Sequence, residues 1–346
     1  MKLPPTRFQL FGLGDRPKLL YRSGSVWDVL RRSRVQTWPV VAEHFRPADY
    51  AVDLDLSDGR RVTICDDEDA LWIDQQGQRK VIGQCPVRLP RFDEHPHAHL
   101  LRVLLGEILV TIEAGAPLPN HLAYRKPWYR DAAMTAMVLA KTGNLHLIRD
   151  WIIHLTDPFD RNNAGDEEPD NLGQLLYLIW LTADASHPLV GRVLRQARRF
   201  TEGHHIVGRT DGAVHPVYQT KWLKFGLRSL GLADPYRPPD LPDSYSPLVW
   251  WAFTDHNPQQ PHFSPRQREL YPYLAWAEDH FYGVHATPPS IQPGCPLSYE
   301  AHASQADYQA MRIVDPGYVT DRIATPHSWH AAEMFLYWQE SQARES

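Results

Sequence analysis

The chain has 346 residues, of which 43% are apolar and 22% are charged, so it is long enough to build one large domain or two smaller ones around a sizeable core. A net charge of −5 without a basic stripe excludes the usual footprint of a nucleic-acid binder. Three widely spaced cysteines, Cys65, Cys85 and Cys295, argue against a disulfide framework and against a zinc cage.

The first twenty residues lack the uninterrupted apolar stretch of a signal peptide, and no run of about 18 apolar residues follows them. We therefore expect a cytoplasmic protein with no membrane partner. The 12 Trp and 30 Pro fit a sugar binder with rigid loops, because the apolar face of a pyranose ring stacks on indole. Each single Trp can equally belong to the core.

Residues 1–95 carry the period-two pattern and the turn residues of β-hairpins. The expected strands are Tyr50–Leu56, Arg61–Cys65, Ala70–Ile73 and Lys80–Ile82. A short helix is expected before them, over Ser25–Arg32. The pattern therefore predicts a small antiparallel sheet that precedes the main body.

From His97 onward, apolar residues recur at helical spacing. The expected helices are Leu100–Ala114, Trp128–Lys141, Leu145–Leu155, Asp170–Ala183, Pro188–Phe200, Thr220–Ser229, Ser246–Thr254, Pro265–Phe281, Ser304–Met311 and Pro326–Gln342. Two segments, Asp131–Ala140 and Leu172–Leu181, are apolar nearly all round, which predicts burial on every face. Buried helices that alternate with amphipathic ones favour an α/α toroid, although an irregular helical bundle would give a similar pattern.

Acidic and aromatic residues gather where these helices begin. Tyr124–Asp131 crowds Trp128, Arg130 and Asp131 at the mouth of a buried helix. Since buried charges are costly unless paired or functional, we expect Asp131 to bind sugar hydroxyls, with a structural Arg130–Asp131 pair as the alternative. The acidic run Asp166–Asp170 precedes the next buried helix, where Glu168 and Asp170 are candidates both for capping and for a binding site.

Three later clusters add further candidates. Arg209–Trp222 brings Asp211, His215, Tyr218, Lys221 and Trp222 together, and Pro296–Tyr308 contains Tyr299 and Glu300. In Thr325–Trp338, Trp329 and Glu333 are four residues apart and share a helix face. A glutamate in such an apolar setting is suited to general acid or base catalysis.

Three segments resemble motifs of the glucoamylase-like six-hairpin glycoside hydrolases, which are (α/α)6 barrels. Trp128–Ala133 is similar to their W-x-R-D-A-A signature, Glu168–Gly173 to their R-P-Q-x-D-G loop, and Ser328–Glu333 to their S-W-x-x-A-E segment. The resemblance covers roughly Leu101 to Trp338. It implies a mainly α fold, an (α/α)6 toroid of six-hairpin type, with a β-rich region over residues 1–95 and a barrel catalytic domain over residues 96–346.

The resemblance also implies residue roles. Asp131 would bind hydroxyls of the terminal sugar, and Glu333 would be the general base that activates water. The family's W-E-E motif for the general acid is missing, and Asp211 lies at the equivalent place, so we expect Asp211 to be the acid, with Glu168 and Glu300 as alternatives. The expected substrate-binding set is Trp128, Arg130, Asp131, Glu168, Asp170, Lys221, Trp222, Tyr299, Glu300 and Trp329.

The expected function is hydrolysis of a glycosidic bond in an oligosaccharide or glycoside, with inversion and with no metal or cofactor. Inverting carboxylate pairs stand roughly 6.5–9.5 Å apart. One alternative is a polysaccharide lyase or sugar epimerase with the bases His204, His205, His215, His327 and His330. The other is a carbohydrate-binding protein without catalytic activity.

Overall fold

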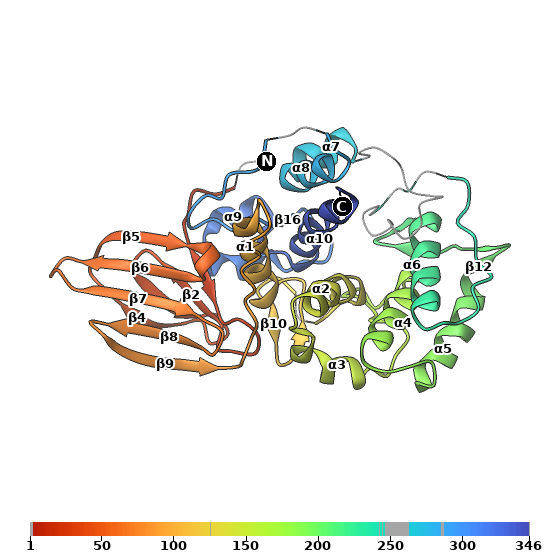
Figure 1. Ribbon diagram of the computed structural model, residues 1–346, viewed down its shortest axis with the longest axis horizontal. Helices are drawn as coiled ribbons and strands as arrows, with labels where there is room; N and C mark the ends of the chain where they lie inside the picture. Colours follow the sequence, from red (N-terminus) through yellow and green to blue (C-terminus); the bar gives the residue numbers. More distant parts are fainter. Residues whose placement is uncertain are drawn as a thin grey trace.

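The computed structural model describes residues 3–124, 126–241, 243, 245, 263–284 and 287–345, with side chains described up to residue 339. The helix expected over Ser246–Thr254 lies outside the described residues. Figure 1 shows the N-terminal sheets at one end of the molecule and the helices at the other. Among the described residues, no helix combines the length and the apolar character that crossing a bilayer requires.

Two antiparallel sheets form the N-terminal region (Figure 1). The first contains β1 (Gln9–Phe11), β2 (Leu19–Arg22), β3 (Ser25–Asp28) and β4 (Ser33–Thr37), and the second contains β5 (Val40–Arg46), β6 (Ala51–Leu56), β7 (Arg61–Asp66), β8 (Ala70–Gln75) and β9 (Gln78–Gln84). Within each sheet, every strand pairs with the next one along the chain. The two hairpins expected from the alternating pattern are therefore confirmed, as β6–β7 and β8–β9.

Apolar side chains from both sheets share one core, which gives the region a sandwich-like character. Phe11 and Val26 of the first sheet pack in the same cluster as Val52, Ile64 and Ile73 of the second. This burial follows from the period-two alternation of strands, which places every second side chain on the same face.

The helix expected over Ser25–Arg32 is wrong, because Ser25–Asp28 is strand β3. Val26 is β-branched and Trp27 is aromatic, and both types favour a pleated strand. Val26 is fully buried and lies opposite Tyr21 of β2. Pairing with β2 thus overrides the weak helical pattern.

Ten helices are described in the rest of the chain, with several one-turn segments between them. They are α1 (Ala98–Leu109), α2 (Tyr129–Lys141), α3 (Arg149–Ile153), α4 (Asp170–Thr182), α5 (Pro188–Ala197), α6 (Pro216–Ser229), α7 (Pro265–Leu270), α8 (Pro272–Phe281), α9 (Pro316–Thr320) and α10 (Ser328–Glu345). Three short hairpins lie between helices: β10–β11 (Ile112–Glu113 with Ala116–Pro117), β12–β13 (Thr201–Glu202 with His205–Ile206) and β14–β15 (Arg209–Thr210 with Ala213–Val214). A fourth pair of two-residue strands, β16 (Glu300–Ala301) and β17 (Ile323–Ala324), brackets α9. The expected helix over Ser304–Met311 is instead a 3-10 helix at Tyr308–Ile313.

Five helices pack side by side in the order α8, α10, α2, α4, α6, and α1 packs on α10 (Figure 1). The burial expected for Asp131–Ala140 and Leu172–Leu181 is confirmed except at the end of each segment, since Asp131–Leu139 and Leu172–Ile179 are buried whereas Ala140 and Trp180 are exposed. The α4–α6 contact depends on a glycine, because a Cβ at Gly173 would lie 2.1 Å from the carbonyl carbon of Trp222.

The expected fold class is wrong in two respects. Helices account for 37% and strands for 20% of the structure, and the N-terminal region is built of antiparallel sheets, so the protein is not mainly α. The described residues show a row of packed helices and no closed (α/α)6 toroid. Apolar periodicity reports that a helix is buried, but it carries no information on whether neighbouring helices close into a ring.

The division at residue 95 stays a prediction. One hydrophobic core crosses it, since Phe8, Leu10 and Leu20 of the β region belong to the same buried cluster as Leu104 and Ile108 of α1. Strand β9 ends at Gln84 and α1 begins at Ala98, so residues 85–97 link the sheets to the first helix.

Candidate functional site

A cavity of about 180 Å³ lies where several helices begin. Its lining comes from five separate parts of the chain: Asp211, Tyr245, Phe263, Gln267, Tyr271, Leu274, Glu300, Trp329, His330 and Glu333. The cavity combines three carboxyl groups, one imidazole and several aromatic rings. It brings together the two expected catalytic residues, Asp211 and Glu333, and two expected binding residues, Glu300 and Trp329.

Arg130, in the first turn of α2, lies beside this cavity and is 3% exposed. Its Nη2 is 3.1 Å from the Oδ2 of Asp211, and its Nη1 is 3.5 Å from the Oε2 of Glu168. The guanidinium carbon also lies 5.0 Å from the ring centre of Trp329, within the range of a cation–π contact. Arg130 therefore joins the beginnings of α2, α4, α6 and α10.

Glu168 and Asp170, at the start of α4, place two carboxyl groups on one side of the Arg130 guanidinium. Burial, together with the charge of Asp170, raises the pKa of Glu168, and burial also raises the pKa of Asp170. The Oε1 of Glu168 accepts the backbone N–H of Asp211 at 2.8 Å. Neither acid lines the cavity. Their observed contacts orient Arg130 and the Asp211 turn.

A second charged chain runs from Asp131 through His327 to Glu300. The Nε2 of His327 is 3.7 Å from the Oδ1 of Asp131 and 3.3 Å from the Oε2 of Glu300. The hydroxyl of Tyr124 donates a hydrogen bond to the same Glu300 carboxylate.

The pKa values along this chain follow from burial and from His327. Burial raises the pKa of Asp131 to about 6. Burial acts in the same direction on Glu300, but the charge of His327 and its hydrogen bond outweigh burial and lower the pKa of Glu300 to about 2. Burial opposes a charge on His327 as well, yet Glu300 and then Asp131 raise its pKa. Glu300 is consequently an anion at neutral pH.

His330 presents an unprotonated nitrogen to the site. Its Nδ1 lies 2.7 Å from the carbonyl oxygen of Tyr299, which can only accept a hydrogen bond, so Nδ1 carries the proton. Burial, with the charge of His327, lowers the pKa of His330 to about 3, which keeps the ring neutral. The second ring nitrogen, Nε2, is therefore an acceptor.

Several buried polar atoms around Arg130 have no hydrogen-bond partner among the described residues. They are Trp128 Nε1, Arg130 Nε and Nη1, Asp131 Oδ1, His327 Nδ1 and Ser328 Oγ. Most buried polar groups in folded proteins are hydrogen-bonded, so such a group of exceptions calls for an explanation. Donors and acceptors left open in one place fit a ligand that is rich in hydroxyl groups.

Glu333 and Trp329 lie one turn apart on α10, as their spacing predicts, and both line the cavity. Glu333 is 3% exposed and lies on the helix that packs against α1, α2 and α8. Trp329 forms a tilted ring contact with Tyr245 at 5.6 Å between centroids. The helix face thus presents an acid and an aromatic wall to the same space.

Of the ten expected binding residues only Glu300 and Trp329 line the cavity, and three of the others are engaged elsewhere. The ring of Trp222 is buried near Phe225, and Lys221 forms an ion pair with Asp243 at 3.2 Å. The hydroxyl of Tyr299 donates to the carbonyl oxygen of Leu270 at 2.7 Å. Helix α6 begins at Pro216 and places Lys221 and Trp222 in the interior, so their expected binding role stays a prediction.

Trp128 also lies outside the lining, and its ring centre is 5.4 Å from the guanidinium carbon of Arg130, which it supports. Sequence reasoning missed Tyr245, Tyr271, Phe263, Gln267 and Leu274, which carry no recognisable motif. His327 and His330 were named only for the alternative chemistry, although the Thr325–Trp338 segment that contains them stood out.

No protein-family model, curated protein or solved structure matches this chain. The resemblance to the six-hairpin glycosidases is therefore a wrong prediction, since no family match supports it and the closed toroid it implies is not seen among the described residues. Short motifs at helix starts recur for reasons of capping and burial, so three of them do not establish a family. Among the described residues, no three His, Cys, Asp or Glu side chains are grouped as a metal site requires.

Proposed function

We propose that the chain is a glycoside hydrolase that cleaves a glycosidic bond with a pair of carboxyl groups in the 180 Å³ cavity. One observation carries the proposal: Asp211, Glu300 and Glu333 converge on a space walled by Tyr245, Tyr271 and Trp329. Two carboxyl groups across a sugar-sized space are the usual machinery of glycoside hydrolysis, and aromatic rings are suited to stack on the ring of a sugar.

The surroundings of the three carboxyl groups suggest their roles. Glu300, whose pKa is about 2, holds no proton at neutral pH and is suited to stabilise positive charge that develops on the sugar. Asp211 is held by the guanidinium of Arg130 at 3.1 Å and by the hydroxyl of Tyr245, so its carboxyl group is fixed in a position from which it can take a proton from water. We therefore assign the general acid to Glu333, the reverse of the order expected from the sequence.

The bond is broken in one displacement in this proposal. Glu333 gives its proton to the leaving oxygen while Asp211 takes a proton from water, and the oxygen of that water bonds to the anomeric carbon. The product has the inverted configuration at that carbon. Asp131, Arg130 and Ser328 each carry at least one buried polar atom without a hydrogen-bond partner among the described residues, in addition to the ion pairs of Arg130 and Asp131. These atoms are suited to bind sugar hydroxyls.

The first experiment measures reducing-sugar release from a panel of aryl glycosides and oligosaccharides. Wild-type protein is compared with Glu333→Gln and with the control Glu202→Gln, which changes an exposed glutamate that does not line the cavity. We expect release by wild type, a loss of about 10²–10⁴-fold in Glu333→Gln, and no change in the control. Binding without release by all three proteins would instead identify a carbohydrate-binding protein.

A leaving-group series separates the acid from the base. Aryl leaving groups that depart readily need little protonation, so Glu333→Gln should lose far less activity on them than on alkyl glycosides. Asp211→Asn should lose similar activity on both. The opposite pattern would return the acid role to Asp211. The anomer formed first, followed by NMR, tests the expected inversion.

A polysaccharide lyase or sugar epimerase is the second candidate, and the neutral His330 at the cavity favours it. An imidazole with a free Nε2 could remove a proton next to a uronate carboxylate. Ultraviolet absorbance of an unsaturated product, lost in His330→Gln and kept in Glu333→Gln, would select this chemistry over hydrolysis.

The setting of the enzyme is part of the proposal. We propose a reducing, cytoplasmic compartment, because Cys65, Cys85 and Cys295 are all free thiols. We propose a carbohydrate as the substrate and neither nucleic acid nor membrane as a partner. Exclusive recovery in an oxidising compartment would contradict the first part.

A further inference from the structure

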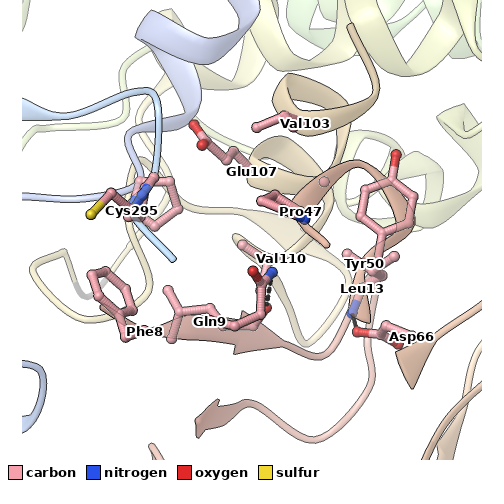
Figure 2. Close-up of a pocket in the computed structure, with 14 residues that line it drawn as sticks. Phe8, Gln9, Leu13, Pro47, Tyr50, Asp66, Val103, Glu107, Val110 and Cys295 are labelled. Atoms are coloured by element: carbon pink, nitrogen blue, oxygen red, sulfur yellow. Dashed lines mark hydrogen bonds between the residues drawn. The ribbon is translucent and has the colours of Figure 1, made fainter. Parts of the chain in front are cut away.

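A second, smaller cavity of about 40 Å³ lies where the N-terminal sheets meet α1 (Figure 2). Phe8, Leu13, Tyr50, Val103 and Val110 are among the apolar and aromatic residues that line it. Figure 2 shows Glu107 projecting from α1 beside this space. Glu107 is 8% exposed, although a carboxyl group is normally found at the surface.

Among the described residues, two consecutive residues donate hydrogen bonds to the Glu107 carboxylate. It accepts the backbone N–H of Leu297 at 2.5 Å, the backbone N–H of Ser298 at 2.9 Å and the hydroxyl of Ser298. Three bonds to a single carboxylate are a strong restraint on this segment, since hydrogen bonds to charged groups are stronger than neutral ones.

The segment held by Glu107 leads directly into the candidate site. The Oγ of Ser298 accepts the backbone N–H of His327 at 3.1 Å, and the carbonyl oxygen of Ser298 accepts the hydroxyl of Thr325 at 2.7 Å. The next carbonyl, that of Tyr299, accepts the Nδ1 proton of His330, and Glu300 then pairs with His327. One short segment, residues 297–300, thus connects Glu107 to the anionic Glu300 and to His327 and His330.

We propose that Glu107 is a positioning residue, which holds Leu297 and Ser298 and thereby sets the distance between Glu300 and His327. Its effect on catalysis rests on the proposed hydrolase function, whereas its effect on the Glu300–His327 pair does not. Glu107 itself touches neither the cavity of the site nor a substrate.

The charge of Glu107 can change near neutrality. Burial raises its pKa to about 7, opposed by the hydrogen bonds from Ser298 and Leu297. The other titratable groups near it are Asp66, which is paired with Arg16, the thiol of Cys295 and the hydroxyls of Tyr50 and Tyr273. A protonated Glu107 accepts fewer hydrogen bonds, so the hold on Ser298 weakens as the pH falls through this range.

The test is an NMR titration of the His327 ring in the full-length protein. The resonance is assigned by its loss in His327→Gln and is followed in wild type, Glu107→Gln and the control Glu113→Gln, which alters a partly buried acid whose charged neighbours are Lys18 and Asp15. In wild type and in the control, the pKa of His327 should stay raised. In Glu107→Gln it should shift down, because the pairing with Glu300 that raises it is loosened.

Two results would overturn the proposal. A folded Glu107→Gln variant whose His327 titration matches that of wild type would show that Glu107 does not set the distance between Glu300 and His327. If Glu107→Gln fails to fold, Glu107→Asp replaces it, since a side chain shorter by one methylene keeps its charge but is withdrawn from all three groups of Leu297 and Ser298 that Glu107 holds. An unchanged titration in that variant would be equally decisive against positioning.

Activity, where the panel reveals any, gives an independent readout. Glu107→Gln should lower kcat with little effect on KM, and it should alter the pH profile near neutrality. If no substrate is hydrolysed, the NMR result still stands. If hydrolysis occurs and the His327 shift does not, only the positioning proposal fails.

Discussion

The molecule contains two buried charged clusters, which differ in how completely their polar atoms are hydrogen-bonded. In the N-terminal region, the Arg16 side chain bonds to Asp66 and to the carbonyl oxygens of Asp67, Glu68 and Cys85. Asp66 also accepts two backbone N–H groups. Around Arg130, by contrast, buried nitrogens and oxygens have no hydrogen-bond partner among the described residues.

The difference separates structural charges from functional ones. A saturated cluster such as Arg16–Asp66 ties loops to a sheet and leaves nothing to offer a ligand. A cluster with open donors and acceptors, beside a cavity, is organised for something that is not part of the chain. Burial alone does not distinguish the two, because Arg16 and Arg130 are 2% and 3% exposed.

The largest effect is expected in the saturated cluster. Arg16→Met leaves Asp66 buried without its cation and should lower the free energy of unfolding by about 3–5 kcal/mol in a denaturant titration. Arg61→Met, which breaks an exposed pair with Asp55, is the matched control and should change it by less than about 1 kcal/mol. Where the protein is active, kcat/KM should survive in both variants. A catalytic defect in a folded Arg16→Met protein would contradict the assignment of the Arg16–Asp66 cluster to structure rather than function.

The open cluster should respond in the opposite way. Because burial raises the pKa of Asp131 to about 6, the folded state binds more protons than the unfolded state between pH 4 and 6 and loses stability as the pH rises through this window. Asp131→Asn removes this loss, so at pH 7 it should increase the free energy of unfolding by about 1–3 kcal/mol. Sugar binding should weaken at the same time. Denaturant titrations at several pH values, with a binding assay, measure both.

A smaller effect concerns the pair between His327 and Glu300. The pair raises the pKa of His327, so its stabilisation is fully present below the ordinary histidine pKa and is lost as the pH rises through the raised value. Glu300→Gln should lower the pKa of His327 and flatten the pH dependence of stability in that window. An unaltered His327 titration would mean that Asp131 alone sustains the charge.

Part of the fold was predictable because local patterns decide it. The alternation in Ala51–Leu56 and Arg61–Asp66, with the turn between them, predicted the hairpin. The apolar residues on every face of α2 and α4 predicted that these helices are buried. Strands without a clear alternation, such as Ser25–Asp28, were misassigned, because their pairing partner rather than their own pattern settles their state.

The residues of the candidate site also differ in whether a local pattern could predict them. Glu333, Trp329, Asp211 and Glu300 could be named in advance, since each lies in a dense polar and aromatic segment near a helix or strand start. Lys221 and Trp222 could not be excluded, because which way a residue faces depends on where its helix begins and what packs against it.

The sequence by itself determined the two hairpins β6–β7 and β8–β9, the largely buried helices α2 and α4, and which short segments carry acids beside aromatic rings. These are properties of periodicity and composition that act within about ten residues. Only the tertiary structure decided that three of those acids share one cavity, that Arg130 and Asp131 keep open polar atoms, and that Glu107 holds the segment that leads to Glu300. Those outcomes depend on contacts between residues as far apart as Glu107 and Ser298, which no local pattern encodes.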